Sequence, residues 1–519
     1  MNAKKRVSKK LIPAMMSVSV AAVSIGAAFA SDVPQDMGDV SGLTDRCEAF
    51  ADAKITGVEI SSSTASTDNE ALPDHCRVQG TIAPNIGFEA RLPLTDWNGK
   101  YFQSGCGGFC GSVLADKPGF SNGINEALKK GYAALTTDNG HKGWLGDASW
   151  AKDNPEALEV YARTGVKFAH AAGTALAKAY YGAEALDRAY FSGCSNGGRM
   201  AAMTAQVYPD LFDGILGGAG VLDLTNSGGV YGPWIYQANS DAGGERILTR
   251  ANFGMDKIKL LEAEVMRQCD GVDGREDGLI SDPYGCEVDL GVLPTCEDGG
   301  KACFSAAQKD VLKKWYQGPQ NSKGEQLYPG VPPGSERFLY VWFLDGDKGM
   351  APGTALGYSY TKYIGFETLP VENYTAADFD FDAHPALLQN RGKLVDATDP
   401  DLSDFRDAGG KYLMWHGLAD PLVLPENSTA YYSAVADKMG GYDAIRDFYR
   451  YFTVPGYGHC WEMPGAGPDS FDPIAALEQW VEDGIAPESI PAKASDPSAR
   501  TKRANLRPYP LQAEPMSEK

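Results

Sequence analysis

The pattern of hydrophobic and polar positions changes along the chain and divides it into segments. Residues 31–96 contain short stretches in which apolar and polar residues alternate, such as KITGVEIS and FEARLPL, as in strands with one buried face. From about residue 100, short apolar runs such as YFQSG, GYAALTT, AYFSG and GILGGAG alternate with helical stretches. This alternation predicts βαβ units and a mostly parallel sheet.

The alternation stops near residue 223 and resumes near residue 400. The region between is rich in Gly, Asp and aromatic residues and contains a few helical stretches, including DKIKLLEAEVMRQC and SAAQKDVLKKWYQG. After it, GGKYLMWHG and RDFYRYFTV again have the pattern of core strands, and IAALEQWVEDG that of a closing helix before a Pro-rich tail. We therefore expect an α/β core in two parts, residues 31–222 and 399–519, with an inserted domain at 223–398.

Residues 1–30 have the pattern of a secretory signal peptide. Five basic residues precede an apolar stretch that ends in Ala28-Phe29-Ala30, a small-x-small cleavage site. We expect cleavage after Ala30 and a secreted or periplasmic mature protein. An uncleaved anchor is disfavoured by the short run and by Pro13.

The charge of the chain narrows the classes of partner. The formal net charge is −21 over 519 residues, and the loss of the five basic residues with the signal peptide would make it −26. A strongly acidic protein is repelled by nucleic acids and by anionic membrane surfaces, and no later segment is long and apolar enough to span a bilayer. A neutral or cell-wall-derived substrate fits better.

The chain contains ten cysteines, an even number that predicts a disulfide framework in a protein that leaves the cytosol. Their separations along the chain suggest Cys47–Cys76, Cys269–Cys286 and Cys296–Cys303, with Cys106–Cys110 as a short fourth bridge. Cys194 and Cys460 are left over.

The clearest candidate for a nucleophile is Ser195. It lies at the centre of Gly193-Cys194-Ser195-Asn196-Gly197, between a predicted strand and a predicted helix. This G-x-S-x-G pattern in a strand-turn-helix context is typical of a nucleophile elbow, in which the flanking glycines permit a sharp turn that exposes the serine hydroxyl.

Two later residues can serve as the partners of such a serine. Asp420 follows one predicted strand and His459 follows the next, so the order is Ser, Asp, His, which is that of α/β-hydrolases. Among the remaining histidines, His416 lies inside a predicted strand. His141 lies too early in the chain for this order and is interpreted as a residue that lines the cleft.

The two remaining cysteines flank this candidate pair. Cys194 directly precedes Ser195, and Cys460 directly follows His459. If the serine and the histidine lie within hydrogen-bonding reach, the two cysteines are close enough for a disulfide. Such a bridge would hold the loop of the base on the turn of the nucleophile.

The combination of these motifs resembles the tannase and feruloyl esterase family of secreted α/β-hydrolases, which includes mono(2-hydroxyethyl) terephthalate hydrolase. Further similar stretches are WNGKYFQSGCGGFCG, TTDNGH, DATDPDLSDFRDAGGKYLMWHGLADPLV and VPGYGHC. They cover the core from about residue 75 to 225 and from about 390 to 490. The resemblance implies an esterase core, a lid inserted before the strand of the aspartate, and an aromatic acyl group in the substrate.

The segment SGCGGFCG is the candidate for one half of an oxyanion hole, because glycines let backbone N–H groups approach a tetrahedral oxyanion closely. The backbone N–H of Asn196 would be the other donor. Members of the family usually have a longer glycine run here, and Cys106 replaces one of those glycines. The first donor is therefore either Cys106 or Gly107, unless the segment is a plain glycine turn.

The inserted region contains a candidate calcium loop in CDGVDGREDGLISDP. Asp270, Asp273 and Asp277 offer hard oxygen ligands on a tight turn, and the carbonyls of Arg275 and Leu279 are further candidates. The same composition also occurs in a solvated acidic turn that binds no metal. The resemblance implies a structural calcium ion in the lid at a loop of this pattern.

These observations predict a secreted serine esterase with Ser195 as nucleophile, His459 as base and Asp420 as the residue that orients the base. The resemblance favours hydroxycinnamoyl esters, with a small, plant-derived substrate, and leaves galloyl esters and a terephthalate monoester as further candidates. The monoester requires a cation that the sequence does not locate. The sequence is also compatible with a lipase or peptidase and with a non-catalytic, calcium-stabilised binding protein.

Overall fold

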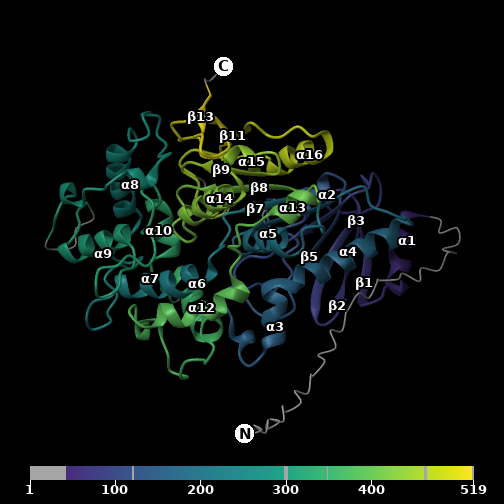
Figure 1. Ribbon diagram of the computed structural model, residues 1–519, viewed down its shortest axis with the longest axis horizontal. Coiled ribbons are helices and arrows are strands. Elements are labelled where there is room, and N and C mark those ends of the chain that lie inside the picture. The colour runs from purple at the N-terminus through teal and green to yellow at the C-terminus, as the bar shows by residue number, and fades with distance from the viewer. Residues whose placement is uncertain (1–41, 120–121, 297–301, 348, 461–464, 517–519) are drawn as a thin grey trace, which may run out of the picture.

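A nine-stranded sheet forms the core of the part of the protein that lies beside a largely helical region (Figure 1). The computed structural model describes residues 42–119, 122–296, 302–347, 349–460 and 465–516, so the predicted signal peptide lies outside the described residues. The strands lie in the order β1-β2-β3-β5-β4-β6-β7-β8-β9. Their bounds are β1 Val58–Ser66, β2 His75–Ile82, β3 Ile86–Pro93, β4 Tyr101–Ser104, β5 Ala133–Thr137, β6 Ala189–Cys194, β7 Gly214–Gly218, β8 Lys411–Gly417 and β9 Tyr449–Val454.

The strand directions confirm the α/β class. Strands β1, β2, β3 and β5 pair antiparallel, whereas all pairs from β5 through β4, β6, β7 and β8 to β9 are parallel. The carboxyl ends of parallel strands lie at the same edge of a sheet, and in open α/β sheets ligands bind at that edge. The loops after β4, β6, β8 and β9 therefore lie on one side of the core.

Helices cover both faces of the sheet. Neighbouring residues of β6 belong to different hydrophobic clusters, Phe191 to one and Tyr190 to the other, as the alternation of side chains along a strand requires. Residues of α4, α5 and α14 pack in the first cluster, and residues of α2 and α16 in the second. The bounds are α2 Asn125–Lys129, α4 Gly165–Tyr181, α5 Asn196–Val207, α14 Pro425–Met439 and α16 Pro473–Asp483.

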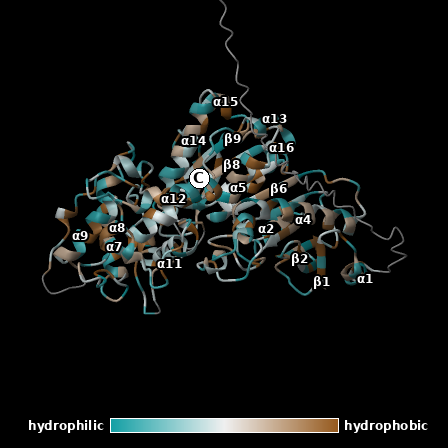
Figure 2. Cartoon of the chain, turned by 60° about the horizontal axis from the view of Figure 1, so that its bottom comes forward, coloured by the Kyte–Doolittle hydropathy of each residue, from teal (hydrophilic) through white to brown (hydrophobic). Residues whose placement is uncertain are grey.

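Residues 219–410 lie between the adjacent parallel strands β7 and β8, and much of this segment forms a helical region beside the sheet (Figure 1). Figure 2 shows brown, hydrophobic segments in this region as well as in the sheet-containing part. The elements are α6 Leu224–Asn226, η4 Ser227–Tyr231, α7 Gly232–Ala238, α8 Met255–Cys269, η5 Pro283–Gly285, η6 Leu290–Val292, α9 Ala306–Gln317, α10 Glu336–Trp342, α11 Pro352–Tyr360, η7 Thr361–Gly365, η8 Ala376–Asp378, α12 His384–Val395 and α13 Ser403–Asp407. The limits of this region as a separate domain stay a prediction.

The C-terminal segment, which the sequence indicated only as a Pro-rich tail, forms a second sheet. Its antiparallel strands are β10 Pro468–Ser470, β11 Ile490–Ala494, β12 Arg503–Leu506 and β13 Glu514–Pro515. The remaining elements are α1 Leu43–Ala49, η1 Phe50–Asp52, η2 Ser149–Ala151, α3 Pro155–Glu159, η3 Val160–Thr164 and α15 Tyr442–Ile445. None of the helices in the described part of the chain is long and apolar enough to cross a membrane.

All ten cysteines lie in disulfides, and the pairs are those that the sequence suggested. Two bridges connect parts of the inserted region, one fastens α1 to β2, and two lie at the edge of the sheet where the loops after β4, β6 and β9 meet. The pairs are Cys47–Cys76, Cys106–Cys110, Cys194–Cys460, Cys269–Cys286 and Cys296–Cys303.

Candidate active site

Ser195 lies on the sharp turn between β6 and α5. Its backbone has φ 63° and ψ −121°, a strained conformation for a residue with a side chain. A Cβ atom at Gly193 would lie 2.5 Å from the backbone of Gly197, so glycine is required where the strand and the helix approach each other. This is the local geometry of a nucleophile elbow.

Asp420 follows β8 and is completely buried. Its Oδ1 accepts hydrogen bonds from the backbone N–H groups of Leu422 at 2.9 Å and Val423 at 3.0 Å, and its Oδ2 lies 2.6 Å from Nδ1 of His459. Burial favours the neutral acid, but the charge of His459 and hydrogen bonds from His416 and His459 outweigh burial and lower the pKa of Asp420 to about 2. The carboxylate is therefore ionised and fixes the orientation of the imidazole.

His459 is buried in the loop after β9, and its ring packs edge-on against Trp342 with 5.5 Å between the ring centroids. Since Nδ1 faces a carboxylate, Nδ1 carries the proton and donates it to Asp420. The second ring nitrogen is then left as an acceptor, which is the tautomer that a general base for a serine requires.

A disulfide connects the loops of the serine and the histidine. Cys194 and Cys460 are bonded, with 6.1 Å between their Cα atoms, although 266 positions separate them in the sequence. The bond joins the residue before Ser195 to the residue after His459, so the predicted bridge is present.

The backbone N–H groups expected at an oxyanion hole are not taken up by acceptors of the described residues. Asn196 is the first residue of α5, where an N–H has no partner within the helix. The N–H groups of Cys106 and Gly107 donate to no backbone carbonyl in the part of the chain that the structure describes. The structure thus offers one donor at the start of α5 and another in the loop after β4, where the choice between Cys106 and Gly107 stays a prediction.

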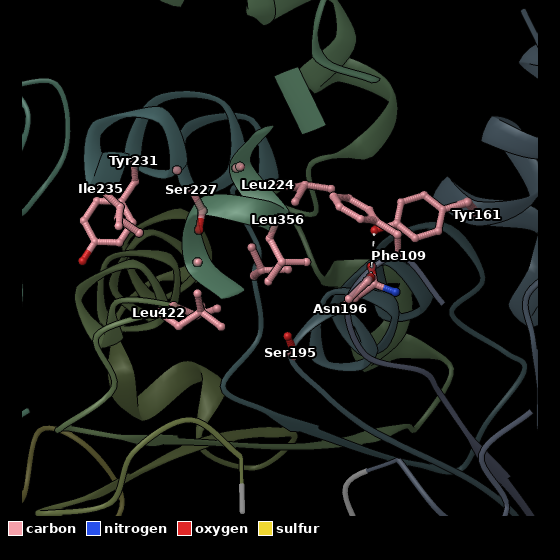
Figure 3. Close-up of a pocket in the computed structure, with 17 residues that line it drawn as sticks. Phe109, Tyr161, Ser195, Asn196, Leu224, Ser227, Tyr231, Ile235, Leu356 and Leu422 are labelled. Atoms are coloured by element: carbon pink, nitrogen blue, oxygen red, sulfur yellow. Dashed lines mark hydrogen bonds between the residues drawn. The ribbon is translucent and has the colours of Figure 1, made fainter. Parts of the chain in front are cut away.

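An apolar cavity opens above Ser195 (Figure 3). The side chains of Leu224, Leu356 and Leu422 come from the inserted region and from the loop after β8, and Phe109 comes from the loop after β4. None of the 17 residues drawn around this cavity is charged.

His416, which the sequence placed inside a strand and set aside as a base, contacts the buried carboxylate. Its Nε2 lies 3.3 Å from Oδ2 of Asp420 and 2.9 Å from the carbonyl of Val423, while Nδ1 lies 2.7 Å from the hydroxyl of Ser428. Because a carbonyl only accepts, Nε2 carries a proton and donates it toward Val423 and Asp420. Asp420 is therefore held by two histidines, and the spacing His-x-x-x-Asp at the end of a core strand is the signal that could have indicated this.

The acidic side chains of the candidate calcium loop accept hydrogen bonds, most of them from the backbone of the loop itself. Asp270 accepts from the N–H of Gly278 and from Nη1 of Arg500 at 2.8 Å, and Asp273 accepts from the N–H groups of Arg275 and Ser281. Oδ1 of Asp277 accepts from the N–H of Leu279.

No group of three or more His, Cys, Asp or Glu side chains in the described residues is arranged to hold a metal ion. The donor types suit calcium, but the arrangement does not gather them, and Asp270 would have to give up its contact with Arg500. The calcium site stays a prediction.

A serine on the turn after one parallel strand, with an aspartate and a histidine after two later strands, is the arrangement that defines α/β-hydrolases. The family model described as "Tannase and feruloyl esterase" matches residues 70–517, and the chain therefore belongs to that family.

Individual relatives agree with this assignment. The chain is 31% identical over 456 residues to a probable feruloyl esterase B-2 of Aspergillus terreus, covering 84% of this chain and 82% of the relative. It is 30% identical to the mono(2-hydroxyethyl) terephthalate hydrolase of Piscinibacter sakaiensis, covering 89% and 88%. The crystal structure of feruloyl esterase B from Aspergillus oryzae superposes with a TM-score of 0.76 at 26% identity, covering 91% and 96%. The protein is a carboxylic ester hydrolase.

We predict that His416 supports turnover through Asp420. His416→Leu removes a donor to the carboxylate at similar side-chain volume, and we expect kcat to fall about tenfold, because a hydrogen bond to a charged group contributes about 1.5 kcal/mol. Ser428→Ala is the matched control, since it removes only the contact on the far side of the ring, and its loss should be smaller. Steady-state kinetics on both folded variants checks this, and full activity of His416→Leu would contradict it.

We propose that Asp270 releases Arg500 and that calcium then binds this loop and stabilises the inserted region. At a calcium concentration 100 times Kd, binding to the folded state alone would add about 2.7 kcal/mol and raise Tm, and chelation would reverse the change. Thermal unfolding with calcium and with EGTA measures this, and Asp273→Asn should abolish the response. Identical Tm values in both conditions, with no calcium found by metal analysis of the protein, would rule the site out.

Proposed function

We propose that this esterase hydrolyses carboxylic esters of aromatic acids, with hydroxycinnamoyl esters such as feruloyl esters as the preferred class. The observation that carries the proposal is the 2.6 Å contact between Asp420 and His459. The Cys194–Cys460 disulfide fastens the loop of His459 to the turn of Ser195, and an apolar cavity is lined in part by Ser195. The names of the relatives, probable feruloyl esterases among them, support the acyl class.

The proposed reaction has two halves. Ser195 Oγ attacks the ester carbonyl while Nε2 of His459 takes its proton, and Asp420 stabilises the imidazolium that forms. The backbone N–H groups of Asn196 and of the Cys106–Gly107 turn stabilise the oxyanion. The intermediate collapses, and His459 returns the proton to the leaving alcohol. In the second half, His459 takes a proton from water, which attacks the acyl group on Ser195. The acid then leaves as His459 returns this proton to Ser195 Oγ.

The lining of the cavity favours a neutral, planar acyl group. The hydroxyls of Tyr161 and Tyr231 already donate to the carbonyls of Gly108 and Pro421, which leaves few free polar groups. Gallate would bury three hydroxyls there. A terephthalate monoester would bury a carboxylate with no cation among the lining residues, and an unpaired buried charge is costly. Hydroxycinnamate fits better than either.

We further propose that the protein acts outside the cytosol on a small ester of plant origin. The five disulfides are those of a protein that folds in an oxidising compartment, and residues 1–30 have the pattern of a signal peptide. The strong negative charge is unsuited to binding nucleic acid or an anionic membrane.

We predict that the mature protein hydrolyses methyl ferulate with a higher kcat/KM than methyl gallate, mono(2-hydroxyethyl) terephthalate or p-nitrophenyl butyrate. Ser195→Ala should lower turnover about 10⁶-fold, as removal of a catalytic serine does. Ser61→Ala, at an exposed serine of β1, is the control and should keep full activity. Cleavage of the butyrate alone would contradict the aromatic class, and no cleavage of any ester would favour a binding protein.

A further inference from the structure

Arg199 is completely buried beneath the nucleophile elbow, one turn into α5. Its Nε donates to Oδ1 of Asn196 at 2.8 Å, and its terminal nitrogens donate to the carbonyls of Tyr161, Ala162 and Val395 at 3.0–3.1 Å. No carboxylate hydrogen-bonds to this guanidinium among the described residues. A buried charge without a hydrogen-bonded counterion is costly, and Asp396 acts on Arg199 only through its charge, so the position of Arg199 indicates a role besides stability.

The contact with Arg199 fixes the orientation of the Asn196 side chain. Because a guanidinium has only donors, the atom of Asn196 that faces it is the carbonyl oxygen. The amide nitrogen Nδ2 therefore faces the loop after β4, where it donates to the carbonyl of Cys106 at 3.1 Å and lies 3.3 Å from the sulfur of Cys110.

The same loop is closed by the Cys106–Cys110 disulfide into a small ring. The carbonyls of two further residues of the ring also contact buried side chains. The hydroxyl of Tyr161 donates to the carbonyl of Gly108, and Nε2 of His141 lies 2.6 Å from the carbonyl of Phe109.

The carbonyls of Cys106, Gly108 and Phe109 are therefore directed into the protein, and that of Gly107 accepts from the N–H of Cys110 within the ring. In a trans peptide the N–H points away from the preceding C=O, so the N–H of Gly107 points away from the Asn196 amide that holds the carbonyl of Cys106. The ring also packs directly on the elbow, since a Cβ atom at Gly197 would lie 3.6 Å from the backbone N and O atoms of Cys106.

We propose that Arg199, the Asn196 side chain and the Cys106–Cys110 disulfide form one positioning unit that sets the distance between the two halves of the oxyanion hole. Asn196 belongs to both halves, because its backbone N–H faces the oxyanion while its side chain holds the ring that carries the second donor. Arg199 and the disulfide act through Asn196 and through the ring and do not touch the substrate. This inference depends on the proposed function.

The unit predicts a specific kinetic effect. An oxyanion hole works through donors that are fixed about 2.7–3.1 Å from the oxyanion, and that charge develops only as the tetrahedral intermediate forms. A change that loosens the ring should lower kcat and leave KM nearly unchanged. It should also weaken a tetrahedral boronic acid inhibitor by the same factor as kcat.

The sharpest variant is Asn196→Asp, which keeps the oxygen that faces Arg199 and replaces the donor Nδ2 by an acceptor beside the carbonyl of Cys106. We expect kcat to fall about 100-fold, as for the loss of one oxyanion donor, with KM within about threefold. Asn239→Asp is the matched control. Asn239 is equally buried, makes one donated and one accepted hydrogen bond with Leu248, and lies in the inserted region, so its variant should keep kcat.

Two further variants test the rest of the unit. Arg199→Lys keeps the positive charge but loses the several hydrogen bonds of the guanidinium. Cys106→Ser with Cys110→Ser opens the ring. We expect each variant to lower kcat and the affinity for the boronic acid about tenfold. Removal of the Cys296–Cys303 bridge of the inserted region by Cys296→Ser with Cys303→Ser is the control and should change neither.

Wild-type kcat and inhibitor affinity in folded Asn196→Asp, or in the ring-opened variant if Asn196→Asp does not fold, would overturn the positioning unit. A rise in KM at unchanged kcat would overturn it as well. Failure of the proposed function is recognised separately, because Ser195→Ala would then retain turnover in an otherwise wild-type chain.

Discussion

The covalent bond between Cys194 and Cys460 is the constraint on which the geometry of this site depends. It joins two loops that are 266 positions apart in sequence, and each cysteine is the neighbour of a residue of the proposed triad. In the chain-entropy model, a loop of this length contributes about 5 kcal/mol to stability. Its more specific effect is on geometry, because the bond limits how far the loop of His459 can move from the turn of Ser195.

The buried polar groups of the site are separate from the surface that would receive the acyl group. The side chains of Asp420, His416 and Arg199 are fully buried, and each contacts another residue of the site. The cavity above is lined by uncharged side chains, many of which come from the inserted region. Fixed polar groups below and an apolar wall above suit a reaction in which charge develops only at the ester carbonyl.

Much of the fold could be predicted from local pattern, because apolar runs such as KYLMWHG are typical of core strands. The order of Ser195, Asp420 and His459 was readable for the same reason, since each follows such a strand. The contact of Asp420 with His416 could not be predicted in this way, because His416 lies inside a strand. Only the turn at residues 417–420 brings Asp420 back to the ring of His416. Strands β10–β13 were missed because they are short and lie among Pro-rich segments.

The most direct test of the central claim is the turnover of a variant with Cys194→Ser and Cys460→Ser, measured as kcat and KM on methyl ferulate at a temperature where the variant is folded. We predict that kcat falls at least about tenfold while KM changes little, because the two loops lose their fixed separation. Loss of the Cys47–Cys76 bridge, which lies at the opposite end of the sheet, should lower stability without this effect on kcat. An unchanged kcat in the Cys194–Cys460 variant would contradict the claim that this bond holds the catalytic pair in place.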